Sequence, residues 1–200
     1  MRKSFKQYLV TTGVVLMVGS IIASYTLREG RLHVVGIDDA QVEVTLDGKL
    51  LVKQGGRGNH HSFIVPRGEH TAVVTEKSTG RSITYAVNIL RVGKTEVVLP
   101  VRPDQCFVRF DVTHAAYSVS GSAPREYPRI EQRYADASGP IRVPSNTYFS
   151  LDELPPNRRG SEDIYLLRHL PCRFVDMPSP FSSLSEDSAT WYTRTATPTP

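Results

Sequence analysis

The sequence lacks the compact residue patterns that mark common catalytic and cofactor sites. The glycine-rich segment 55–58 does not continue into the Gly-Lys-Ser/Thr ending of a phosphate-binding loop. No Gly-x-Ser-x-Gly motif is present, and the acidic pairs Asp38–Asp39 and Glu162–Asp163 lack the spacing of a calcium loop. We therefore predict a protein that is not an enzyme, with no catalytic, cofactor-binding or metal-binding residues. A Ser–His–Asp triad assembled in space stays open as a weaker alternative.

Three histidines are close enough in the sequence to suggest zinc. His60, His61 and His70 could together supply three imidazole ligands. Adjacent residues of a strand point to opposite faces, however, so His60 and His61 cannot easily bind one ion. We expect polar histidines at the edge of a loop.

Aromatic residues and long apolar stretches are too few for a protein that crosses a membrane many times. Apolar residues make up 40% of the 200 residues and aromatic residues 8%. The 14 glycines and 14 prolines favour strands and irregular structure over long helices.

The net charge of +4 is concentrated at the amino terminus. Residues 1–30 contain four basic residues but a single acidic one, Glu29, and the rest of the chain is nearly balanced. The basic character therefore belongs to the flank of a membrane segment, and we expect no nucleic-acid partner.

Residues 7–27 carry no charge and are long enough to cross a bilayer, which takes roughly 20 residues of helix. Tyr8 and Tyr25 lie near the two ends, where aromatic rings favour the lipid headgroups. Arg2, Lys3 and Lys6 precede the span and predict a cytoplasmic amino terminus. A cleaved secretory signal is the alternative, but its expected cleavage sites near Ala23 and Ser24 have Ile where a small residue is preferred.

An alternation of apolar and polar residues follows this segment. It predicts short strands at 32–35, 42–46, 50–52, 61–65, 70–76, 82–89, 95–101 and 106–112. Asp47–Gly48 is a strong hairpin signal, because both central residues of such a turn need positive φ. Tyr85 and Phe63 are expected to face the core. The pattern predicts an antiparallel β-sandwich over residues 28–120.

Three segments of this region resemble a known family. They are Val-Thr-Leu-Asp-Gly-Lys at 44–49, Phe-Ile-Val-Pro-Arg-Gly-Glu-His at 63–70, and a run from Val87 that ends in Val-Gly-Lys-Thr-Glu-Val-Val-Leu. Together they make residues 32–101 similar to the PEGA-type small β-domains of bacterial envelope proteins. The resemblance implies an extracytoplasmic, non-catalytic module, often tethered beside other machinery.

The carboxyl-terminal third has a different composition. We predict an irregular extension at 121–176, in which 141–144 is a short strand, 148–155 a helical turn and 163–170 a buried strand or short helix. A Ser/Thr/Pro-rich tail follows at 177–200, where Trp191 and Tyr192 are expected partner contacts, as are Tyr8 and Tyr25 in the membrane segment. Cys106 and Cys172 are either a disulfide, as an oxidising compartment favours, or two separate buried thiols.

The fold class predicted overall is mainly β: one transmembrane helix, an antiparallel sandwich and an irregular extension. The expected role is a non-catalytic accessory or structural subunit of a larger complex in the bacterial inner membrane. Residues 1–6 would be cytoplasmic and the body periplasmic, so that the partners are the bilayer and other subunits of a respiratory, photosynthetic, secretory or transport complex. The alternative is a stand-alone envelope module that binds glycan or peptidoglycan through loops such as 54–60.

Overall fold

A computed structural model describes residues 29–36, 42–56, 60–90, 95–103, 105–117, 128–135, 139–156, 162–178 and 180–184. The predicted transmembrane segment with Tyr8 and Tyr25, the acidic pair Asp38–Asp39, and Trp191 with Tyr192 lie outside the described residues. Among the residues that the structure describes, no helix is both long and apolar enough to cross a membrane.

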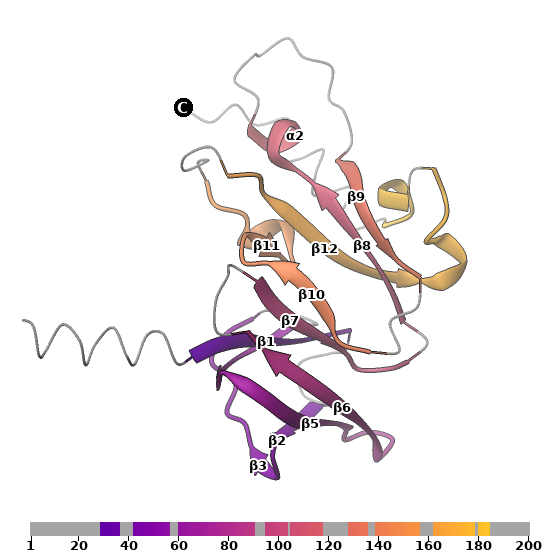
Figure 1. Ribbon diagram of the computed structural model, residues 1–200. Helices are drawn as coiled ribbons and strands as arrows, with labels where there is room; N and C mark the ends of the chain where they lie inside the picture. Colours follow the sequence, from indigo (N-terminus) through magenta and orange to yellow (C-terminus); the bar gives the residue numbers. More distant parts are fainter. Residues whose placement is uncertain are drawn as a thin grey trace, which may run out of the picture.

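The described chain forms three four-stranded sheets (Figure 1). Sheet A has the order β10-β7-β1-β4, sheet B the order β3-β2-β5-β6, and sheet C the order β11-β12-β8-β9. The strands are β1 (Glu29–Val35), β2 (Val42–Leu46), β3 (Lys49–Leu50), β4 (His60–Pro66), β5 (Gly68–Glu76), β6 (Arg81–Ile89), β7 (Thr95–Pro100), β8 (Gln105–Asp111), β9 (Arg129–Tyr134), β10 (Ile141–Pro144), β11 (Thr147–Tyr148) and β12 (Tyr165–Pro171).

The prediction of a mainly β fold is confirmed. A strand lies near each position expected between 32 and 112, but the one expected at 50–52 is only the short β3 at Lys49–Leu50. Asp47 and Gly48 have φ values of 49° and 77°, as a two-residue hairpin turn between β2 and β3 requires. Most pairs are antiparallel, but β1 pairs with β7 and β11 with β12 in parallel. A parallel pair needs a crossover connection, and the intervening strands of sheet B provide the one between β1 and β7.

Sheet A is the middle layer of the molecule, with sheet B on one side and sheet C on the other (Figure 1). On β1, Leu32 and Val34 pack against sheet B, whereas Val35 packs with Phe107 and Leu167 of sheet C. Residues 32–35 are therefore all buried. Because both faces of β1 are covered, its sequence shows a continuous buried run in place of alternation.

The prediction of an irregular extension at 121–176 is wrong, because four strands lie there. The chain leaves the first two sheets at β8, which becomes a central strand of sheet C between β12 and β9. It then returns to sheet A as β10, which pairs with β7, before β11 and β12 complete sheet C. In place of the single sandwich predicted for residues 28–120, the three sheets form two sandwiches that share sheet A. The second sandwich includes strands between residues 129 and 171.

Short helical turns cover the outer face of sheet C. They are α2 (Thr113–Tyr117), η1 (Leu151–Glu153), η2 (Cys172–Phe174) and η3 (Pro180–Ser183). Residues from these turns or beside them, including Leu151, Val175 and Phe181, form a third core with Val108 and Phe110 of β8. The predicted turn within 148–155 and the strand at 163–170 are both present.

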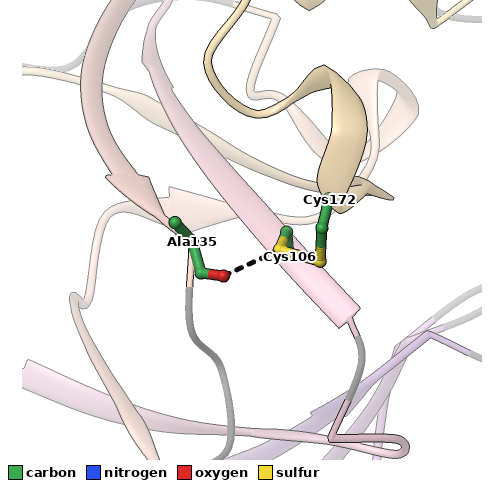
Figure 2. The surroundings of a disulfide bond; sticks show 3 residues. All are labelled: Cys106, Ala135 and Cys172. Atoms are coloured by element: carbon green, nitrogen blue, oxygen red, sulfur yellow. Dashed lines mark hydrogen bonds between the residues drawn. A yellow bond between two sulfur atoms is a disulfide. The ribbon is translucent and has the colours of Figure 1, made fainter.

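A disulfide joins Cys106 of β8 to Cys172 of η2, which is the first of the two alternatives left open by the sequence (Figure 2). Cys106 is fully buried, and its sulfur lies 3.0 Å from the carbonyl oxygen of Ala135. A bonded sulfur carries no hydrogen, so we interpret this as a close contact. The bond fixes the end of β12 and the turns after it to the centre of sheet C.

Loss of the disulfide is expected to destabilise sheet C. For a sequence separation of 66 residues, chain entropy predicts a loss of about 4 kcal/mol in the free energy of unfolding. Denaturant unfolding of the oxidised and reduced protein measures this difference. The control is the double variant Cys106→Ala, Cys172→Ala, on which reductant should have no effect; equal midpoints for oxidised and reduced wild type would contradict the prediction.

Candidate functional site

A cleft of about 380 Å³ opens on the side of sheet A that faces sheet C. Its walls come from β1, β4 and β7, from the segment 54–56, and from residues 145–153. Two histidines and two glutamates, His33, His60, Glu96 and Glu153, form a connected group in this cleft.

His33 occupies the centre of the group. Its side chain projects from β1 on the face opposite Leu32 and Val34, and the residue is 3% exposed. Its Nε2 lies 2.7 Å from Oε2 of Glu96 on the neighbouring strand β7, and its Nδ1 lies 2.9 Å from Nε2 of His60. Both ring nitrogens are thus within hydrogen-bond distance of a partner.

His60 extends the group toward the carboxyl-terminal part of the chain. It begins β4 opposite Val35 in the register, so its side chain lies diagonally across from His33. Its Nδ1 lies 3.3 Å from Oε1 of Glu153 in η1, and its ring stacks on Phe149 with centroids 3.9 Å apart. The other oxygen of Glu153 accepts the backbone N–H of Phe149 at 3.1 Å. Four side chains from four elements, Glu96, His33, His60 and Glu153, are therefore connected in one line by contacts of hydrogen-bond length.

Burial and hydrogen bonding set the charges of this line. Burial lowers the pKa of His33, although Glu96 acts in the opposite direction. Burial raises the pKa of Glu153, but hydrogen bonds from His60 and from backbone N–H groups outweigh it, and the net shift is downward. His33 is consequently held neutral, and Glu153 is held as a carboxylate, near neutral pH.

Gly56 allows the loop before β4 to approach His60 closely. Its φ of 96° lies in the region that favours glycine, and a Cβ atom there would overlap the carbonyl oxygen of His60. Gly55 also bridges to Ser62 of β4, which holds the loop against the edge of sheet A.

The hydrogen bonds within the line limit its chemistry. Ser62 lines the cleft and lies opposite His33 in the β1–β4 register, but both nitrogens of His33 are engaged by Glu96 and His60. In this arrangement, each ring nitrogen of His33 and His60 faces another member of the group and is directed at neither a serine nor a metal site. Among the described residues, no group of three or more His, Cys, Asp and Glu side chains is arranged to hold a metal ion.

The structure corrects the expected position of the histidines. His60 and His61 are each 5% exposed, so both are buried inside the protein, although His60 is the first residue of β4. His70 lies on β5 of sheet B, where its Nδ1 is 2.7 Å from Oδ2 of Asp47, and it takes no part in the cleft. The expectation that Tyr85 and Phe63 face the core is confirmed, since they are 3% and 4% exposed. Glu162 and Asp163 are exposed, as expected of a solvated pair.

The pairing of His33 with Glu96 was missed by the sequence analysis. A signal was available, because a histidine within the apolar run 32–35 and a glutamate in the apolar run 95–101 must each be buried if their strands are central. Comparison with protein-family models, curated proteins and solved structures finds no match to this chain.

Replacing Gly56 with Ala is expected to displace His60 and destabilise the protein. The variant Gly80→Ala is the matched control, because Gly80 also has positive φ (68°) but has open space where a Cβ would lie. Gly80→Ala should reduce the free energy of unfolding by about 1 kcal/mol, the cost of the left-handed conformation, and Gly56→Ala by a clearly larger amount. Denaturant unfolding measures the free energy of unfolding of both variants. Equal losses would show that the close approach of Gly56 to His60 does not contribute to stability.

Proposed function

We propose that the chain is a non-catalytic accessory subunit of a complex in the bacterial inner membrane. Residues 7–27 would anchor it, and its β body would lie in the periplasm against neighbouring subunits. The disulfide between β8 and η2 is the observation that carries the proposal, because such bonds persist in oxidising compartments outside the cytoplasm. The resemblance of residues 32–101 to PEGA-type domains is in keeping with it.

The cleft supports a role without catalysis. Its histidines and glutamates are bonded to one another, as expected of a buried polar group that holds elements in place. An active-site base, in contrast, needs a nitrogen or oxygen directed at its substrate.

A pair of exposed apolar side chains supports contact with a partner. Leu50 and Val52 are 62% and 77% exposed, whereas Leu51 between them packs against the core of sheets A and B. Alternate residues of an extended segment point the same way. The two side chains therefore form a small apolar surface at the edge of sheet B, where contact with a neighbouring subunit would remove them from water.

A stand-alone module that binds glycan or peptidoglycan is the second candidate. The cleft favours it, because part of the loop 54–60 forms one wall and Tyr148 lies on another. Thr147 also lines the cleft, and its buried hydroxyl has no hydrogen-bond partner within the described part of the chain. A sugar hydroxyl could supply that partner.

Purification of the full-length chain in mild detergent, with mass spectrometry of co-purifying proteins, tests the first proposal. We expect membrane subunits in stoichiometric amounts. The double variant Leu50→Ser, Val52→Ser should lower their recovery roughly tenfold, the effect of losing about 1.4 kcal/mol of binding free energy. The body should remain folded, because both side chains are exposed.

Ile64→Ser is the matched control, since Ile64 is also exposed (45%) but lines the cleft. Normal recovery from this variant would assign the contact to Leu50 and Val52. Purification of the wild-type chain alone would exclude the accessory role. Binding of soluble peptidoglycan fragments, lost in Ile64→Ser, would then establish the second candidate.

A further inference from the structure

The line Glu153–His60–His33–Glu96 contains three contacts of unequal length. The His33–Glu96 contact is 2.7 Å, the His33–His60 contact 2.9 Å, and the His60–Glu153 contact 3.3 Å. Each contact needs one proton between its two heavy atoms to be a hydrogen bond. A fully bonded line therefore holds three protons.

Two neutral imidazoles between two carboxylates supply only two of these protons, because a neutral ring has one N–H. One contact must then place a lone pair against another lone pair. His33, the more deeply buried ring, stays neutral and directs its N–H toward Glu96 at the shortest distance. His60 then donates from Nε2 to Nδ1 of His33, which leaves Nδ1 of His60 without a hydrogen beside Glu153. The missing proton thus falls at the longest contact.

We propose that His60 is a pH-sensitive latch that fastens residues 147–154 to sheet A when its Nδ1 takes up the third proton. Water supplies the proton, and the ring becomes an imidazolium that donates to the carboxylate of Glu153. At higher pH the proton returns to water, and the His60–Glu153 contact loses its hydrogen bond. The latch is inferred from the geometry of the cleft and not from the accessory role. An experiment can therefore contradict the latch without contradicting the accessory role, and the reverse.

Two carboxylates and an aromatic ring lie around His60. Glu153 and Glu96 supply two negative charges, and Phe149 presents its ring face to the imidazolium. Arg31, the positive group that lines the cleft, is 4.0 Å from Oε1 of Glu96 and is largely exposed. The other ionisable side chains that line the cleft are those of His33, which is held neutral, and Tyr148. Adding one proton to two carboxylates and two neutral rings lowers the buried net charge from −2 to −1.

The latch acts on the wall of the cleft through Glu153. One of its oxygens faces His60 and the other holds the backbone N–H of Phe149, so the carboxylate links β4 to the start of η1. Phe149 belongs to the core between sheets A and C, and Leu151 and Leu154 belong to the core beyond sheet C. A change at His60 is therefore transmitted to the junction between the two sandwiches.

Nuclear magnetic resonance of the full-length chain in detergent, with histidines labelled with ¹⁵N, measures the proton on each ring. Between pH 8 and pH 5, where histidines titrate, we expect His60 to gain a proton on Nδ1 while His33 stays neutral. Glu153→Gln removes the negative charge but keeps an oxygen for the N–H of Phe149. With that charge removed, a smaller fraction of His60 rings should carry the Nδ1 proton than in the wild-type chain at the same pH.

Hydrogen exchange of the same samples tests the latch itself. After correction for the intrinsic rate, the amides of Phe149 and Leu154 should lose protection about tenfold from pH 5.5 to pH 8, the effect of one hydrogen bond to a charged group. The control is Asp47→Asn, which removes the negative charge beside His70 in sheet B. It should leave both the protonation of His60 and the protection of Phe149 unchanged.

Two results for the wild-type chain would overturn the proposal. In one, the proton count of the His60 ring is constant between pH 5 and pH 8 in the wild-type chain, a measurement that needs no variant to fold. In the other, the ring titrates but protection of Phe149 and Leu154 is independent of pH. A pH-dependent protection that persists in a folded Glu153→Gln variant would likewise assign the effect to another group.

Discussion

The burial of sheet A on both faces is the constraint on which the rest of the structure depends. Sheet B covers one face and sheet C the other, so β1 and β7 contain continuous runs of buried residues. Any polar side chain on these strands must find its partner inside the protein. His33 and Glu96 meet this requirement by contacting each other. His60, on the edge strand β4, contacts His33 and Glu153 in the same way.

The two sandwiches are not independent units, because the chain passes back and forth between them. β8 lies at the centre of sheet C, β10 returns to sheet A, and β12 completes sheet C. The cleft forms where these passages meet, between sheet A and the segment that leads from β10 to η1. A site in this position responds to any change in how sheets A and C pack, whether its role is to support an assembly or to receive a ligand.

Local sequence predicts the positions of the strands well, but it predicts poorly which strands pair with one another. Alternating side chains locate β2, β5 and β6, and Asp47–Gly48 fixes the turn between β2 and β3, because these features depend on nearby residues only. The transfer of β8 to sheet C depends on partners far along the chain, and β9 has too few apolar residues to show a pattern. The histidine group was missed for the same reason, since His33 and Glu96 lie 63 residues apart and meet only through the β1–β7 pairing.

The interleaved strand order also has a consequence for synthesis. Sheet B consists of β2, β3, β5 and β6, and only β4 of sheet A interrupts this series along the chain. Its strands can therefore pair with one another as soon as β6 has been made. β8, in contrast, is flanked by β12 and β9, which are made later, and Cys106 receives its partner only after a further 66 residues. During synthesis, an apolar strand with a free thiol would thus stay unpaired until the last strand has been made. Unpaired apolar strands promote aggregation, so early pairing within sheet B does not by itself protect β8 in that interval.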